Sequence, residues 1–160
     1  MLTEKETFEI DEAMRHYAQP QEAAVDALRI VQRRRGWVSD ESLADLAAFI
    51  GVSTAGLDAV ATFYNRIYRK PVGKHVILVC DSVSCWIMGY RQITDHIRFR
   101  LGLQSLYGTS GDGLFTLMPS ACLGACDHAP VMMVDEELYR DLTIEMVDEV
   151  LEKYRGKSAE

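Results

Sequence analysis

Two spacings of apolar residues divide the chain near residue 70. Before that point, apolar side chains recur every three or four positions, as at Leu43, Leu46 and Ile50, which is typical of amphipathic helices. After it, residues 75–80 (HVILVC) form a short β-branched run that is typical of a buried strand. The pattern predicts a helical segment followed by a segment that mixes strands and helices.

Start and stop signals predict four helices in the first segment. Thr3 and Glu6 fit a capping box at the start of the first helix. Pro20 suits the first turn of the second helix, which ends in three arginines and Gly36. Two capping serines and a glycine stop bound the third and fourth helices: Ser39, Gly51 and Ser53. We therefore expect an N-terminal helical bundle over residues 1–70.

The second segment predicts strands and helices in turn. After the first strand come a helix around Ile93, Ile97 and Leu101, strands at 114–118, 131–134 and 138–140, and a last helix capped by Thr143. The helix between the first two strands should make a right-handed crossover connection, so that these two strands are parallel. This order is that of thioredoxin-like folds, with a loop where thioredoxin has its middle helix. We therefore expect an α+β chain with a mixed sheet in residues 71–160.

The four cysteines of the chain form two close pairs. Cys80 and Cys85 (C-x4-C) follow the first predicted strand, and Cys122 and Cys126 (C-x3-C) lie in the loop after the second. Because the carboxyl ends of parallel strands share one edge of a sheet, both pairs should meet there. Cys85 should also open a helix, whose N-terminus would lower the pKa of that thiol. Two thiol pairs on separate loops suit a four-coordinate metal centre.

Composition narrows the classes of function. The chain has 48% hydrophobic and 26% charged residues, which is typical of a soluble globular protein. Its net charge of −7 is a poor match to the phosphates of a nucleic acid. No secretory signal and no apolar run near the roughly 18 residues of a membrane span is visible. We therefore expect a cytoplasmic protein, in which paired cysteines bind metal more often than they form disulfides.

Three arrangements compete for the two cysteine pairs. Disulfides fit poorly, because the C-x-x-C spacing of thiol–disulfide exchange is absent. A structural zinc held by four thiolates nearly fits the spacing. A 2Fe-2S cluster fits as well, because the loops offer backbone N–H donors to sulfur and Gly124 allows close backbone approach. A Rieske-type centre is disfavoured, since only His128 lies near the pairs.

Residues 43–64 imitate a helix-turn-helix motif. Residues 40–65, however, contain four acidic side chains and no Lys or Arg, so the second helix has little to offer phosphates or guanine edges. Two helices packed at a sharp turn explain the pattern better than a DNA-binding site. We therefore expect no nucleic-acid partner.

The cysteine motifs resemble the thioredoxin-like 2Fe-2S ferredoxins. The resemblance rests on Cys80-x4-Cys85, on Cys122-Leu123-Gly124-Ala125-Cys126, and on Ala129-Pro130. Three further segments extend it: Gly36-Trp37-Val38, VATFY at 60–64 and PVGKH at 71–75. Within that family, the chain is most similar to the small peripheral-arm subunit of NADH:quinone oxidoreductase (complex I). Pro130 stands where thioredoxin-like folds often hold a cis proline, so we predict a cis bond there.

The resemblance implies an electron-transfer subunit with one 2Fe-2S cluster on Cys80, Cys85, Cys122 and Cys126. The cluster would exchange single electrons with FMN on the adjacent flavin- and NADH-binding subunit. The chain itself has no G-x-G-x-x-G nucleotide loop, so hydride transfer would belong to that partner. Residues 1–70 would be a helical partner-binding domain, and residues 71–160 a thioredoxin-like 2Fe-2S domain.

The same resemblance implies a setting and leaves two alternatives. Other peripheral-arm subunits would be further partners, and the complex would hold the chain at the inner face of the cell membrane without direct insertion. One alternative is the equivalent 2Fe-2S diaphorase subunit of an NAD-linked hydrogenase or formate dehydrogenase. The other, from a different class, is a four-cysteine zinc-stabilised interaction module.

Overall fold

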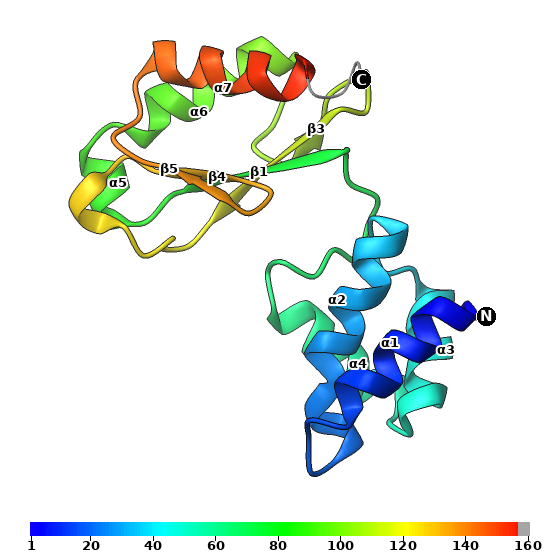
Figure 1. Ribbon diagram of the computed structural model, residues 1–160. Helices are drawn as coiled ribbons and strands as arrows, with labels where there is room; N and C mark the ends of the chain where they lie inside the picture. Colours follow the sequence, from blue (N-terminus) through cyan, green and yellow to red (C-terminus); the bar gives the residue numbers. More distant parts are fainter. Residues whose placement is uncertain (157–160) are drawn as a thin grey trace. The chain divides into compact units, whose positions relative to one another are not determined.

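The computed structural model describes residues 1–156 of the chain, which divides into two compact units. The first unit is Met1–Pro71 and the second is Val72–Glu160 (Figure 1). Each unit has its own hydrophobic core, and the two cores share no residue. The fold class is therefore α+β, as the sequence predicts.

The first unit is built from helices, most of whose ends follow the predicted signals; the second begins at Ala24, after a 3-10 turn that holds Pro20. The elements of this unit are α1 (Glu4–Met14), the 3-10 turn η1 (Pro20–Ala23), α2 (Ala24–Arg35), α3 (Asp40–Ile50) and α4 (Thr54–Phe63). Thr3 and Glu6 form the predicted capping box of α1. The hydroxyls of Ser39 and Ser53 accept backbone N–H groups at the starts of α3 and α4. Gly51 ends α3 in the left-handed conformation that glycine adopts without strain.

A buried carboxylate joins α1 to α2. Glu6 is 1% exposed, and its two oxygens accept from Arg35 Nε at 2.7 Å and Arg35 Nη2 at 2.6 Å. Arg35 Nη1 also donates to the Ser42 hydroxyl of α3 at 2.8 Å. The Arg35 hydrogen bonds lower the pKa of Glu6 to about 2, so this carboxylate stays charged well into acid. Arg35 of α2 thus links three helices, through a two-pronged ion pair with α1 and a hydrogen bond to α3.

The second unit is a mixed five-stranded sheet in the order β2-β3-β1-β4-β5. Its elements are β1 (His75–Cys80), α5 (Val83–Ile87), α6 (Tyr90–Leu101), β2 (Gly108–Thr109), β3 (Phe115–Ser120), η2 (Cys126–His128), β4 (Met132–Val134), β5 (Glu137–Tyr139) and α7 (Ile144–Gly156). Strands β1 and β3 pair in parallel, and the other neighbours pair antiparallel. Figure 1 shows α6 and α7 side by side over one face of the sheet, where the core of this unit lies.

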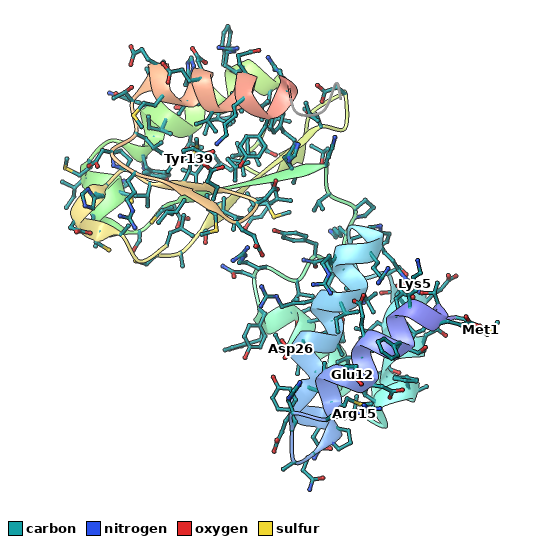
Figure 2. All side chains as sticks on the ribbon, viewed as in Figure 1. Met1, Lys5, Glu12, Arg15, Asp26 and Tyr139 are labelled. Atoms are coloured by element: carbon teal, nitrogen blue, oxygen red, sulfur yellow. The ribbon has the colours of Figure 1, made fainter. Side chains whose placement is uncertain are left out.

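The hairpin of β4 and β5 is fastened to α7 by polar side chains. Lys153 of α7 donates to both oxygens of Glu137 and to the Tyr139 hydroxyl, at 2.7 to 2.9 Å. The Tyr154 hydroxyl donates to the same Glu137 at 2.9 Å. Tyr139 accordingly lies between the sheet and α7 (Figure 2). The hairpin is thereby held against α7, and its Leu138 packs against the buried cluster that contains Cys80 and Cys85.

The structure corrects several predicted boundaries. The predicted strand 114–118 is β3 at Phe115–Ser120, which continues to the loop of the second cysteine pair. The helix expected after Cys85 is split into α5 and α6, because Gly89 between them adopts a φ of 94°. The two-residue strand β2 was not predicted, since it is too short to show a periodicity. The Ala129–Pro130 bond is cis, as predicted.

No single helix within residues 1–156 is both long and apolar enough to cross a membrane. The pair α3 and α4 reaches that length and composition only when taken together, across a bend of 116°.

Candidate metal centre

The first cysteine pair is buried at the carboxyl end of β1. Cys80 is the last residue of that strand and donates its backbone N–H to the Val131 carbonyl at 3.1 Å. Cys85 lies in α5, and both thiols are at most 2% exposed. They pack with Ala125, Ala129 and Val131 in a small cluster of their own. This cluster brings the loop of the second pair against the first.

The second cysteine pair is exposed in the loop after β3. The sulfur atoms of Cys122 and Cys126 lie 3.3 Å apart. The backbone N–H of Gly124 donates to the Cys122 sulfur at 3.3 Å, and Gly124 has a φ of 81° that favours glycine. The loop is thus shaped so that a backbone donor points at sulfur.

The two pairs lie at the same end of the sheet. Asp81, which follows Cys80, donates its N–H to the Ser120 carbonyl at the end of β3, at 3.0 Å. Ser84 of α5 lies near enough to Cys126 to lower the pKa of its thiol, and Cys80 lies near enough to raise it. The parallel pairing of β1 and β3 therefore brings together thiols that are far apart in sequence.

Burial and neighbours shift the pKa values of the thiols in opposite directions. Burial, helped by a hydrogen bond with Cys80, raises the pKa of Cys85 to about 11. The expectation that a helix N-terminus would lower it is wrong for this chain, because α5 has only five residues and its thiol is dry. The Gly124 N–H lowers the pKa of Cys122, whereas the hydrogen bond with Cys122 raises that of Cys126. A bound metal would displace these protons.

One residue that sequence analysis did not identify holds the second pair's loop in place. Asp141 accepts from His128 Nδ1 at 2.8 Å, and its backbone N–H donates to the His128 carbonyl at 2.8 Å. Leu142 donates to the Pro130 carbonyl next to it. Asp141 has a φ of 49°, which is unusual for a residue other than glycine. No sequence signal pointed to Asp141, since it lies 13 residues from its partner.

The thiols of the four cysteines are the candidate donors of a metal centre. Within residues 1–156, no three Cys, His, Asp or Glu side chains converge on a single ion position. The thiols gather instead as two pairs. Four thiols grouped as two pairs are the donors that a 2Fe-2S cluster takes, two on each iron. The residues present therefore fit the cluster.

The thioredoxin-like sheet and the paired thiols define a ferredoxin class, and comparison with known proteins agrees. Residues 10–155 match the family described as thioredoxin-like 2Fe-2S ferredoxin, so the chain belongs to that family. Within it, the chain is a homologue of one subunit of NADH-quinone oxidoreductase. It is 44% identical to that subunit from Escherichia coli and 42% identical to that from Pseudomonas aeruginosa. Each alignment covers 96% of this chain and 92% of the relative.

Solved structures share the fold at lower identity. A chain of the NAD+-reducing NiFe hydrogenase in the air-oxidised state superposes with a TM-score of 0.69 and 21% identity. The match covers 81% of this chain but only 23% of the hydrogenase chain. At this identity, the likeness is one of fold alone.

Proposed function

We propose that this chain is the electron-transfer subunit of an NADH:quinone oxidoreductase. One observation carries the proposal. The two thiol pairs are gathered at one end of the sheet in a chain that is 44% identical, over 96% of its length, to a subunit of the Escherichia coli NADH-quinone oxidoreductase. The hydrogenase alternative has weaker support, because its 21% identity reflects the fold alone.

The proposed ligands of one 2Fe-2S cluster are Cys80, Cys85, Cys122 and Cys126. The buried pair would hold one iron and the exposed pair the other, because the thiols are grouped in that way. The Gly124 N–H supports Cys122 as a ligand, since a donor to sulfur stabilises a thiolate. The His128–Asp141 contact would hold the outer ligands in position.

The chain's own residues bind and orient the cluster, and a partner performs the chemistry with NADH. When bound, the cluster supplies one-electron exchange with a flavin, which receives two electrons at once as a hydride. FMN and NADH are assigned to the adjacent subunit, because the sequence has no G-x-G-x-x-G loop. We assign binding of that subunit to the helical unit Met1–Pro71. Other peripheral-arm subunits complete an assembly at the inner face of the cell membrane.

Spectroscopy of the purified protein tests the proposal. From iron-replete expression, we expect a reddish-brown protein with about two iron and two sulfide per chain and a rhombic EPR signal after dithionite reduction. Co-purification with the flavin- and NADH-binding subunit should accompany it. A colourless protein that holds one tightly bound zinc and no iron would instead support the zinc-stabilised module.

A further inference from the structure

Helix α5 carries large apolar side chains on its exposed face. Four neighbouring apolar side chains, three in α5 and one at its end, are more than half exposed, and we call them the α5 patch: Val83 (67%), Trp86 (54%), Ile87 (70%) and Met88 (60%). On its inward side Cys85 is buried in the cluster that contains Ala125, Ala129 and Val131, whereas Ser84 is only half-buried. A surface helix of a protein that acts alone shows the opposite arrangement. The α5 patch is therefore a surface that suits burial against something else.

The α5 patch is continuous with the exposed thiols. Ser84 follows Val83 in the same helix and reaches Cys126, so the patch begins where the cysteine loop ends. In Figure 1, α5 lies beside the yellow segment that carries η2. Cys122 and Cys126 are both exposed. A partner seated on the patch would also cover these thiols.

The charge around the α5 patch indicates the chemistry of its partner. No residue of α5 is charged, whereas Asp81 and Asp127 are exposed on its cysteine side. Asp127 is 80% exposed, and its neighbour is the His128 ring at 3.5 Å. Residues 71–160 carry eight Lys and Arg against thirteen Asp and Glu, a balance of −5. The complementary surface is apolar at its centre and basic where it would meet Asp81 and Asp127, while the exposed Arg91 follows the patch at the start of α6.

We propose that the α5 patch docks onto the flavin-bearing subunit, as a contact separate from the one assigned to the helical unit. The inference rests on the proposed function, in which that subunit is the cluster's electron-exchange partner. Trp and Met are enriched in the cores of protein interfaces, and one Trp often carries much of the binding energy. The same contact removes water from the outer thiols and shortens the path for an electron, whose transfer slows steeply with distance.

The test is binding of the intact, cluster-loaded chain to its flavin- and NADH-binding subunit. Ile87→Glu places a charge in the centre of the α5 patch and should weaken binding at least about tenfold. Trp86→Ala should weaken it to a similar extent. The visible and EPR spectra of both variants should match those of the wild type. Hydrogen exchange in the wild-type complex should show protection of residues 83–88 relative to the free chain.

Phe99→Glu is the matched control. Phe99 lies on α6, is 82% exposed and is not part of the α5 patch, so its variant should bind like the wild type. The inference is overturned if Ile87→Glu and Trp86→Ala bind normally with intact spectra, or if Phe99→Glu loses as much affinity. Either result leaves the proposed function standing. A wild-type chain without a cluster, or without affinity for the flavoprotein, would overturn both.

Discussion

Glu6 shows how a single residue gains a defined charge from its surroundings. It is buried, yet it stays ionised because Arg35 meets both of its oxygens. A buried charge is tolerated only when it is paired in this way, and removal of one partner leaves the other without compensation. The free energy of unfolding of the helical unit therefore depends on this pair.

Glu6→Gln should lower the free energy of unfolding of the helical unit by about 2 kcal/mol at pH 7. The folded-state pKa of Glu6 is depressed to about 2, so its stabilisation is present above the unfolded pKa near 4.3. That stabilisation is lost as pH falls through the folded pKa. The gap between wild type and variant should therefore shrink between about pH 4 and pH 2.

Urea unfolding followed by Trp37 fluorescence in a Trp86→Phe background measures this effect in the helical unit. Glu4→Gln is the control, because Glu4 is exposed in the same helical turn and should change stability by less than about 0.5 kcal/mol. A gap between wild type and Glu6→Gln that stays constant down to about pH 2 would contradict the assignment.

At the scale of elements, the segment before β1 is held against β3 by a close backbone approach. The Gly73 N–H donates to the Thr116 hydroxyl at 2.6 Å. A Cβ at Gly73 would lie 2.9 Å from the Phe115 carbonyl carbon and 3.0 Å from the Gly113 oxygen. These are backbone atoms, which cannot move aside as a flexible side chain does. Gly73 therefore sets how the chain enters the sheet.

Gly73→Ala should lower the free energy of unfolding of the second unit by about 1–3 kcal/mol, because the added methyl overpacks this contact. Urea or thermal unfolding of the cluster-loaded chain measures the change. Gly111→Ala is the matched control, since its Cβ would meet nothing within 4 Å. Equal stability of the two variants would show that the close approach relaxes at little cost.

Elements with strong local signals could be predicted from the sequence. The caps of α1, α3 and α4 were correct, and β1 was predicted at its observed bounds, because capping residues and β-branched runs act locally. The division of α5 from α6 and the strand β2 were missed. A glycine in a helical pattern is often tolerated, and a two-residue strand forms only because β3 is beside it.

In the candidate site, too, features with local sequence signals could be predicted and features that depend on long-range packing could not. The cysteine pairs could be identified from spacing, and the parallel pairing of β1 and β3 placed them together. The raised pKa of Cys85 and the role of Asp141 could not be predicted. Both depend on which segments pack around the loop, and that is decided by the fold as a whole.

At the scale of the whole molecule, the two units have independent cores. The helical core contains no residue of the cysteine cluster, and the cysteine cluster contains no residue of the helices before residue 71. A change at the cysteine pairs should therefore act on the second unit and leave the first unaffected, because sites without shared partners behave additively.

Cys122→Ser should bleach or shift the visible spectrum and lower the urea midpoint of the second unit. The free energy of unfolding of the helical unit, read from Trp37, should change by less than about 0.5 kcal/mol. Ala121→Ser is the control, because it adds a hydroxyl at an exposed neighbouring position and removes no thiol. A Cys122→Ser chain with an unaltered spectrum would remove Cys122 from the proposed ligands.

The exposed apolar face of α5 should affect how long an unassembled copy of the chain survives in a cell. A copy that has not joined a complex presents Trp86 and Ile87 to the surrounding water. Chaperones and proteases act on exposed apolar surface of this kind. The abundance of the chain would then follow the supply of its partner, since copies made in excess would be degraded. Exposure of Trp86 and Ile87 would then mark the copies that have not been assembled.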